Sequence, residues 1–403
     1  MTTNGPVARR LYMDNAATSF PKPPEVLAAM VDYAQRIGAS AGRGAYAEAQ
    51  ESGRVIRECR ERLNQLFNGQ DPNHFIFTLN CTDALNLAIQ GILRPGDHAI
   101  TTWLDHNSVL RPYDALCRQH GGEFTHVPLD KRECIADPQD IKKAIRKNTR
   151  LIAVVHGSNV TGSVQAVREI GKIAREAAVP FLVDAAQTAG HVPIDVQADC
   201  IDMLAAPGHK GLLGPLGTGF LYMRPGLEKL IRPLRYGGTG SVSEQSTQPE
   251  MMPDKYESGS HNAIGIAGLS AGLKYLLDRT VADLWAHDRA LCKTFMSDLE
   301  GVDNLRYLGP QGIKNRMGVF SVQIDGIAPL ALSRMLEDEY GILTRPGLHC
   351  APLAHETIGT LSTGGTTRLS FGPFLQSFDV KYAADALCQI ALRNHASPGV
   401  SVA

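Results

Sequence analysis

The regular alternation of short apolar runs with helix-spaced segments, from about residue 70 to about residue 225, most constrains the fold of this chain. The apolar runs that predict buried strands are His74–Leu79, His98–Thr102, Arg150–His156 and Pro180–Asp184. Between them, Asp83–Leu93 and Gln165–Ala178 have the spacing of helices that bury one face. Strand, helix and strand in this rhythm predict a parallel sheet with right-handed crossovers, which is an α/β fold.

The second half of the chain has a different pattern. Gly217–Met223 predicts one more strand, and Tyr236–Asp254 is so rich in Gly, Ser, Thr and Pro that it predicts a long irregular loop. A long helix is expected over Ala263–Leu277. Beyond it, the predicted elements are strands at Gly318–Ile324 and Thr367–Phe371 and a helix at Pro329–Tyr340. A chain of 403 residues is too long for one core, so two domains are expected.

Charge and cysteine usage exclude several classes of protein. The 40 basic and 41 acidic residues balance, so no nucleic-acid or membrane partner is expected. No apolar run is long enough to span a bilayer, and Met1–Arg10 is not followed by the apolar stretch of a secretory signal. The eight cysteines form no CxxC pair, so neither a metal site nor a disulfide framework is expected. Together these features predict a cytoplasmic protein.

Lys210 carries the sharpest local signal. It lies in the glycine-rich segment 207–211 (PGHKG), directly after the apolar run Ile201–Ala206. A lysine that is desolvated there loses its proton more easily and can act as a nucleophile. The five residues alone are equally compatible with a turn that carries a surface lysine.

Asp184 ends a predicted strand, and in open α/β sheets ligands bind at the carboxyl ends of strands. A carboxylate there can pair with a pyridinium nitrogen, and the alternative role is a helix N-cap. Thr82 and Asp83 begin a helix whose free N–H groups could bind a phosphate, although Thr and Asp favour helix starts in any case. His106 follows the next strand and could stack on a planar ring, or be a structural histidine.

Nine segments in this order resemble the cysteine desulfurase and selenocysteine lyase branch of the class V, fold-type I pyridoxal-phosphate enzymes. They are DNAAT (14–18), CTDALN (81–86), DHNS (105–108), HGSNVTG (156–162), DAAQTAG (184–190), GHKGLLGPLGTG (208–219), ESGSHN (257–262), GLHCAP (347–352) and TTRLSFG (366–372). The resemblance implies a large domain, residues 16–257, with a mainly parallel seven-stranded sheet. Residues 1–15 and 258–403 would form a smaller α+β domain that carries Cys350 and Arg368.

The resemblance also implies roles for individual residues. Lys210 would hold pyridoxal 5'-phosphate as a Schiff base, and Asp184 would pair with the pyridine nitrogen. The other cofactor contacts would come from Thr82, Asp83, His106, Asn159, Gln187, His209 and, across a homodimer interface, Ser260 of the partner's copy. Substrate would be held by Asn15, Ala16, Asn159 and Arg368, since a planar guanidinium can bind both oxygens of a carboxylate.

Cys350 decides the specialisation that the resemblance implies. It matches the family's persulfide loop, in which a thiolate beside His349 would attack the substrate sulfur and leave alanine. The expected activity is therefore a cysteine desulfurase with Lys210, Cys350 and His106 as catalytic residues and a possible sulfur-acceptor protein as partner. If Cys350 is only a structural thiol, the alternative function is that of a class V aminotransferase or of another C–S or C–Se lyase that does not use Cys350. A non-enzymatic protein on the same fold is a third alternative.

Three segments depart from the family pattern. Pro207 stands where a phosphate-binding hydroxyl is common, and His261 adds a titratable group to the partner-facing loop. The polar stretch 236–241 (YGGTGS) could add contacts to phosphate or substrate. These departures bear on the choice among cysteine, selenocysteine and other amino acids more than on the cofactor.

Overall fold

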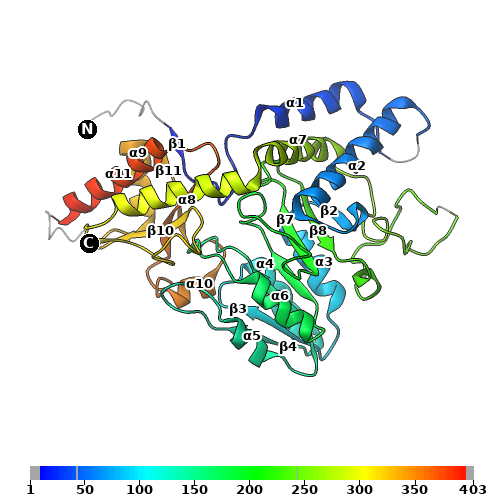
Figure 1. The fold of residues 1–403 in the computed structure, drawn as a ribbon, viewed down its shortest axis with the longest axis horizontal. Coiled ribbons are helices and arrows are strands. Elements are labelled where there is room, and N and C mark those ends of the chain that lie inside the picture. Colours follow the sequence, from blue (N-terminus) through cyan, green and yellow to red (C-terminus); the bar gives the residue numbers. More distant parts are fainter. Residues whose placement is uncertain (1–9, 42–43, 243, 396–403) are drawn as a thin grey trace.

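The computed structural model describes residues 10–41, 44–242 and 244–395, and it shows a large sheet wrapped by helices beside a smaller sheet (Figure 1). Residues 1–9 and 396–403, which the sequence assigns to the small domain, lie outside the described part.

The large sheet has seven strands in the order β2-β8-β7-β6-β5-β3-β4. Their bounds are β2 Phe75–Thr78, β3 His98–Thr102, β4 Glu123–Val127, β5 Thr149–Val155, β6 Phe181–Asp184, β7 Met203–Pro207 and β8 Gly219–Met223. Only β8 runs against its two neighbours, and the other pairings are parallel. The predicted α/β fold with a mainly parallel seven-stranded sheet is therefore confirmed.

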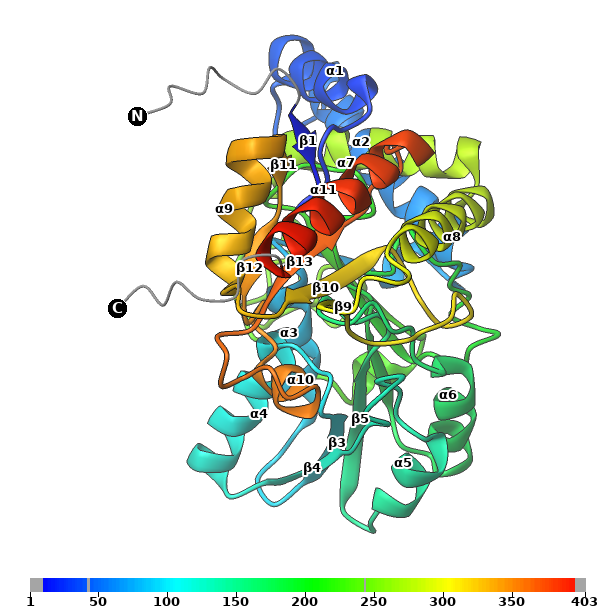
Figure 2. The ribbon, with the colours of Figure 1, turned by 90° about the vertical axis from the view of Figure 1, so that its left-hand side faces the viewer.

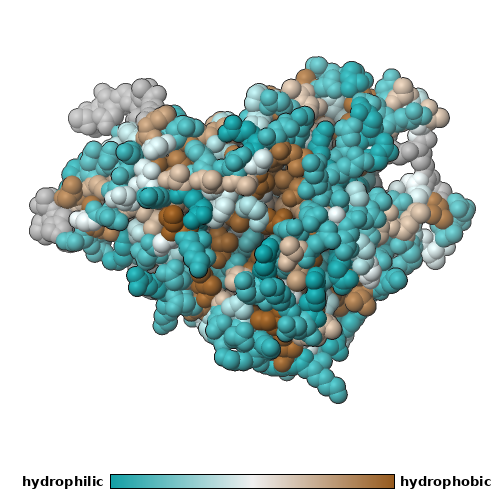
Figure 3. Space-filling view, viewed as in Figure 1, coloured by the Kyte–Doolittle hydropathy of each residue, from teal (hydrophilic) through white to brown (hydrophobic). Residues whose placement is uncertain are grey.

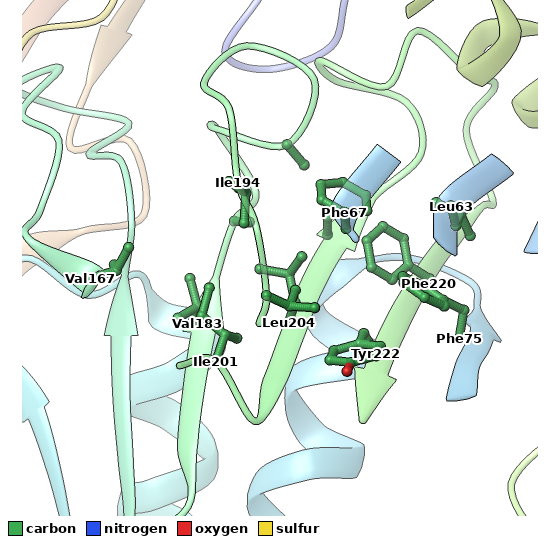
Figure 4. Packing of buried hydrophobic residues seen from close by; sticks show 14 of the residues in the cluster. Leu63, Phe67, Phe75, Val167, Val183, Ile194, Ile201, Leu204, Phe220 and Tyr222 are labelled. Carbon is green, nitrogen blue, oxygen red and sulfur yellow. The ribbon is translucent and has the colours of Figure 1, made fainter. Parts of the chain in front are cut away.

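Helices cover both faces of this sheet because its strands are apolar on both sides. In β2, Phe75 and Phe77 belong to one core cluster and Ile76 to another, as the alternation of side chains along a strand requires. Figure 4 shows the first cluster, in which Phe67, Phe75 and Phe220 pack on one another. The surrounding helices are α1 Pro24–Asp32, α2 Ala47–Phe67, α3 Cys81–Ile92, α4 Asn107–His120, α5 Pro138–Ala144, α6 Val167–Glu176 and α7 Ala263–Arg279.

The smaller sheet is antiparallel, in the order β12-β13-β10-β9, and has a core of its own. Its strands are β9 Leu305–Tyr307, β10 Val319–Ile324, β12 Arg345–Gly347 and β13 Thr366–Ser370, and its helices are α8 Val281–Asp298, α9 Pro329–Tyr340, α10 Pro352–Thr357 and α11 Ser377–His395. The N-terminal strand β1 (Leu11–Tyr12) joins this part by pairing with β11 (Ile342–Leu343). The smaller α+β part expected near the C-terminus is confirmed.

The two cores do not divide the chain at a single point. Ile266, Leu269, Leu273 and Leu276 of α7 belong to the core cluster of the large sheet, beyond the expected boundary at residue 257. That boundary remains a prediction.

The surface and the placement of α10 bear on the site. The face in Figure 3 is mostly hydrophilic, with apolar residues in separate patches. Among the described residues, the structure has no helix that is both long and apolar enough to cross a bilayer.

In Figure 2, α10 lies between the small sheet and α4, next to the end of β3. The small part of the molecule thus reaches the carboxyl edge of the large sheet.

Candidate active site

A pocket opens at the carboxyl ends of the large sheet, where most of the predicted cofactor contacts meet. The predicted residues that line it are Thr82, His106, Asn159, Asp184, Gln187, His209 and Lys210. They come from the segments after β2, β3, β5, β6 and β7. Parallel strands bring these segments to one edge, which is why residues so distant in sequence form one pocket.

Lys210 lies in the turn after β7, and its preceding carbonyl is unusually well anchored. The backbone N–H of Ser19 and the side chains of Thr18, Ser19 and Lys22 all lie within 3.1 Å of the His209 carbonyl oxygen. Burial lowers the pKa of Lys210, while the negative charge of Asp184 acts in the opposite direction. A lowered pKa leaves more of the amine unprotonated, and a nucleophile needs that form.

Asp184 ends β6 and is almost fully buried. The N–H of Ala186 donates to Oδ1 across 2.9 Å, and the Cys81 thiol donates to the same oxygen across 3.5 Å. Burial raises the pKa of this carboxyl group. With both of these bonds on Oδ1, Oδ2 is left to meet a positively charged partner, and a protonated pyridine nitrogen is suited to that position.

His106 caps α4 rather than standing free. Its Nδ1 accepts the backbone N–H of Ser108 at 3.0 Å, so a neutral ring carries its proton on Nε2. Burial, and next the positive charge of Lys210, lower the pKa of His106 to about 4, which keeps the ring neutral. The Ser108 hydroxyl also lies 2.7 Å from that of Thr82. These two hydroxyls offer donors for a phosphate near the position where Pro207 has none.

Asn159 lines the pocket, and Arg368 of β13 contacts its backbone from outside the lining residues. Arg368 is 1% exposed, binds Asp14 at 2.6 Å, and donates to the Asn159 carbonyl at 3.2 Å. Its Nε is buried and has no partner among the described residues. An unsatisfied guanidinium donor is costly to bury, and a substrate carboxylate would satisfy it.

Gln187 and the N-terminal segment are tied together. The Gln187 amide donates to the Ala16 carbonyl at 3.0 Å, and the Asn15 amide donates to the Ser370 carbonyl at 3.1 Å. These bonds place the segment around Asn15 between the pocket and the strand of Arg368. The cofactor role of Gln187 and the substrate roles of Asn15 and Ala16 remain predictions.

Two predicted cofactor residues lie outside the pocket. Asp83 faces away from it, because its carboxylate binds the N–H of Leu79 and the guanidinium of Arg235. Ser260 lines a separate hollow together with His261. A contact from Ser260 to a neighbouring subunit, as the family resemblance implies, stays a prediction.

Cys350 is exposed on a turn whose backbone carbonyls accept hydrogen bonds from two other segments of the chain. The Asn159 amide donates to the His349 carbonyl at 2.6 Å, and the Asn107 N–H donates to the Cys350 carbonyl at 2.9 Å. Both ring nitrogens of His349 bind other groups, the Arg345 carbonyl at 2.9 Å and His355 at 3.3 Å. The Cys350 thiol therefore lies beside His349 in the chain, but the ring of His349 is engaged by other groups, and the attack of Cys350 on a substrate sulfur stays a prediction.

Sequence reasoning gave no role to several residues that the structure places at the site. Asp14 pairs with Arg368, Ser108 binds both Thr82 and His106, and Cys81 contacts Asp184. All three lie within the matched motifs, and this position in the sequence could have marked them as site residues. Their hydrogen-bond and ion-pair partners could not be predicted, because these depend on the fold. No group of three His, Cys, Asp or Glu in the described residues is arranged to hold a metal ion.

Comparison with known proteins gives a consistent result. The family model of class-V aminotransferases matches residues 11–382. A probable cysteine desulfurase of Methanothermobacter thermautotrophicus is 34% identical over 385 residues, which cover 94% of each chain. A cysteine desulfurase of Haloferax volcanii is 30% identical and covers 94% of this chain and 88% of its own. The apo structure of a cysteine desulfurase from Thermococcus onnurineus matches with a TM-score of 0.89 and 30% identity, over 95% of both chains.

Proposed function

The chain belongs to the class-V aminotransferase family, and we propose that it is a cysteine desulfurase that uses pyridoxal 5'-phosphate and Cys350 to convert L-cysteine into L-alanine. One observation supports this proposal most directly. Asn159, which lines the pocket around Lys210, and Asn107 both donate hydrogen bonds to the turn that carries the exposed Cys350 thiol.

The residues of the pocket fit the cofactor. Asp184 would meet the pyridine nitrogen, Thr82 and Ser108 would bind the phosphate, and His106 would face the ring. When bound, pyridoxal phosphate supplies an electron sink that stabilises negative charge on the substrate's carbon atoms. Arg368 and the Asn159 segment would hold the substrate carboxylate, which leaves the substrate sulfur directed away from Arg368.

Sulfur transfer requires a thiolate and a proton donor. The Cys350 sulfur attacks the sulfur of the substrate, and a sulfur–sulfur bond forms as the carbon–sulfur bond breaks. The electron pair of the broken bond stays with carbon, which takes up a proton, and we assign the delivery of this proton to Lys210. The products are alanine and a persulfide on Cys350, so the atoms of cysteine are all accounted for.

The same proposal includes the assembly and the setting of the enzyme. Ser260 lies in a hollow apart from Lys210, which fits a homodimer in which it would bind the phosphate held by a second copy of the chain. All eight cysteines are free, which fits a reducing cytoplasmic compartment. A sulfur-acceptor protein would then take the persulfide sulfur from the exposed Cys350.

The test is to incubate the purified protein with cysteine, selenocysteine and other amino acids while following alanine, pyruvate and the mass of the Cys350 peptide. We expect alanine from cysteine and a mass gain of one sulfur atom on Cys350. Cys350→Ala should lose both, whereas Cys117→Ala, a half-buried thiol of α4, should keep both. Pyruvate or a 2-oxo acid as the main product, or full alanine formation by Cys350→Ala, would contradict the proposal and favour a lyase or an aminotransferase.

A further inference from the structure

One buried histidine takes no part in the chemistry described above. His355 lies in α10, is fully buried, and stands behind the turn that carries Cys350. Its ring packs on that of His349, with centroids 5.4 Å apart and an interplanar angle of 29°. Burying two imidazoles together is unfavourable unless their nitrogens are hydrogen-bonded. The hydrogen bonds of the two rings therefore indicate the role of the His349–His355 pair.

Both imidazoles are neutral at physiological pH. Burial lowers the pKa of His355 to about 4. Burial, and next the positive charge of Arg368, lower the pKa of His349 to about 3. The other charged group that faces His349 is Arg345, which also disfavours a second proton on the pair. Each ring then has one N–H donor and one bare nitrogen acceptor.

The hydrogen bonds fix which nitrogen carries each proton. Nε2 of His349 lies 2.9 Å from the Arg345 carbonyl, which only accepts, so Nε2 is protonated. Nδ1 of His349 is then the acceptor, and Nε2–H of His355 donates to it across 3.3 Å. Nδ1 of His355 accepts in turn from the Thr360 hydroxyl, at 2.7 Å. The donors therefore run one way, from Thr360 through both rings to Arg345.

This chain of bonds ends at a turn with unfavourable backbone angles. His349 and Cys350 have φ values of 50° and 59°, a left-handed conformation that residues other than glycine rarely adopt. Asn159 and Asn107 hold the two carbonyls of the turn from the segments after β5 and β3. The Ala351 N–H closes the turn itself by donating to the Leu348 carbonyl at 3.0 Å. The ring of His349 adds a further anchor, at the Arg345 carbonyl, and its direction depends on His355.

We propose that His355 is a positioning residue: backed by Thr360, it locks His349 in the tautomer that binds Arg345, and so holds the left-handed turn that presents the Cys350 thiol to the substrate sulfur. This inference rests on the proposed function, in which Cys350 accepts sulfur. His349 then acts by its position, because neither of its ring nitrogens is free to take the proton of Cys350.

The test compares His355→Phe, which removes both hydrogen bonds, with His355→Gln, whose amide N–H can still donate to Nδ1 of His349. A displaced thiol reacts slowly but does not alter substrate binding. We therefore expect His355→Phe to lower kcat for alanine about tenfold or more while KM for cysteine changes less than about twofold. His355→Gln should restore most of the rate, and the visible band of the bound cofactor should stay unchanged in both.

A second readout reports on the tautomer itself. In protein with isotope-labelled histidine, the nitrogen resonances of the His349 ring should show a protonated Nε2 and a bare Nδ1. His355→Phe should convert this pattern to a mixture of tautomers, and His355→Gln should keep it. The matched control is His126→Phe on β4, a half-buried histidine in edge-to-face contact with Phe124, which should alter neither readout.

The outcomes separate this inference from the proposed function. If the wild-type enzyme forms no persulfide on Cys350, the proposed function fails, and the positioning role fails with it. If the persulfide forms but His355→Phe keeps both the wild-type kcat and the His349 tautomer, only the positioning role is overturned. Should His355→Phe not fold, Thr360→Val decides: it removes one hydroxyl with little change of shape, and an unchanged kcat and tautomer would overturn the inference.

Discussion

The proposed function assigns the pocket around Lys210 and the turn around Cys350 to one site, but the protein holds them in different ways. The pocket is built on the ends of buried strands, where Asp184 is the last residue of β6 and Lys210 lies in the turn after β7. The turn belongs to the smaller part of the molecule and carries an exposed thiol. It is fixed by hydrogen bonds from Asn159 and Asn107, and by one that the His349 ring donates to the Arg345 carbonyl. The comparison teaches that the cofactor side is set by the sheet, whereas the sulfur side is set by a few separate contacts.

The largest expected effect comes from the pocket. Lys210→Ala would remove the proposed covalent anchor and proton donor together, so we expect alanine formation to fall by about 10²- to 10⁴-fold, the range of a lost acid–base group, or more. Absorbance spectra should show that the band of the bound cofactor is displaced. Cys350→Ala is the contrast, because it should stop alanine formation yet leave that band intact. A Cys350→Ala protein that lost the cofactor would show that turn and pocket are one unit.

Acid should weaken both regions through their buried histidines, with the same sign. Burial lowers the pKa of His355 near the turn, and of His156 after β5, from 6.5 to about 4. A group with a lowered folded pKa contributes its full stability above the unfolded pKa of 6.5, and this is lost as pH falls toward 4. Each of the two corresponds to about 3 kcal/mol of unfolding free energy.

Urea unfolding over that pH range measures this loss. His355→Gln and His156→Gln should each flatten the fall of the unfolding free energy, compared with the wild type. Alanine formation should respond to acid less steeply only in His355→Gln, since only His355 supports the Cys350 turn. Equal acid sensitivity in all three proteins would contradict the prediction.

Arg368 joins the two regions, and its replacement should act on substrate affinity. Arg368→Lys keeps the charge but loses the planar donor pair and the free Nε that a carboxylate would use. A charge-assisted hydrogen bond contributes about 1.5–3 kcal/mol, so KM for cysteine should rise about 10- to 100-fold. Steady-state kinetics measure this, with Arg306→Lys as the control, since the contacts of Arg306 with Asp325 and Gln323 are exposed and lie away from the pocket. An unchanged KM would remove Arg368 from the carboxylate site.

How well the sequence predicted each region follows from how that region is held. The strand expected at His98–Thr102 has those bounds in the structure, because a buried parallel strand is an apolar run with clear ends. The sequence did not indicate that β8 runs against its neighbours, since an apolar run carries no direction. The helix α2 was not predicted, because its long polar sequence buries only a narrow stripe that includes Ile56 and Leu63.

The site divides in the same way. Lys210 and Asp184 stand at strand ends, so their motifs and their local structure agree, and both line the pocket. The role of His355 could not be predicted, because it depends on a tautomer set by Arg345 and Thr360, which lie on separate segments of the folded chain. The hydrogen bonds of His349 likewise exist only in the folded turn. Contacts between irregular segments have no periodic pattern in the sequence, and this is why the sulfur side was predicted less completely.

The smallest expected effect concerns the thiol beside Asp184, and it tests whether the pocket is as rigid as its strands suggest. The Cys81 S–H donates to Oδ1 of Asp184 and so helps to leave Oδ2 for the cofactor. A hydrogen bond of this kind contributes about 1 kcal/mol, so Cys81→Ala should weaken cofactor binding about fivefold, and Cys81→Ser, which keeps a donor, should not. Titration of the cofactor-free protein with pyridoxal phosphate measures this affinity directly. If Cys81→Ala bound the cofactor as tightly as the wild type, the Ala186 N–H and the end of β6 would suffice to orient Asp184, and the contrast between a pocket set by the sheet and a turn set by separate contacts would be sharper still.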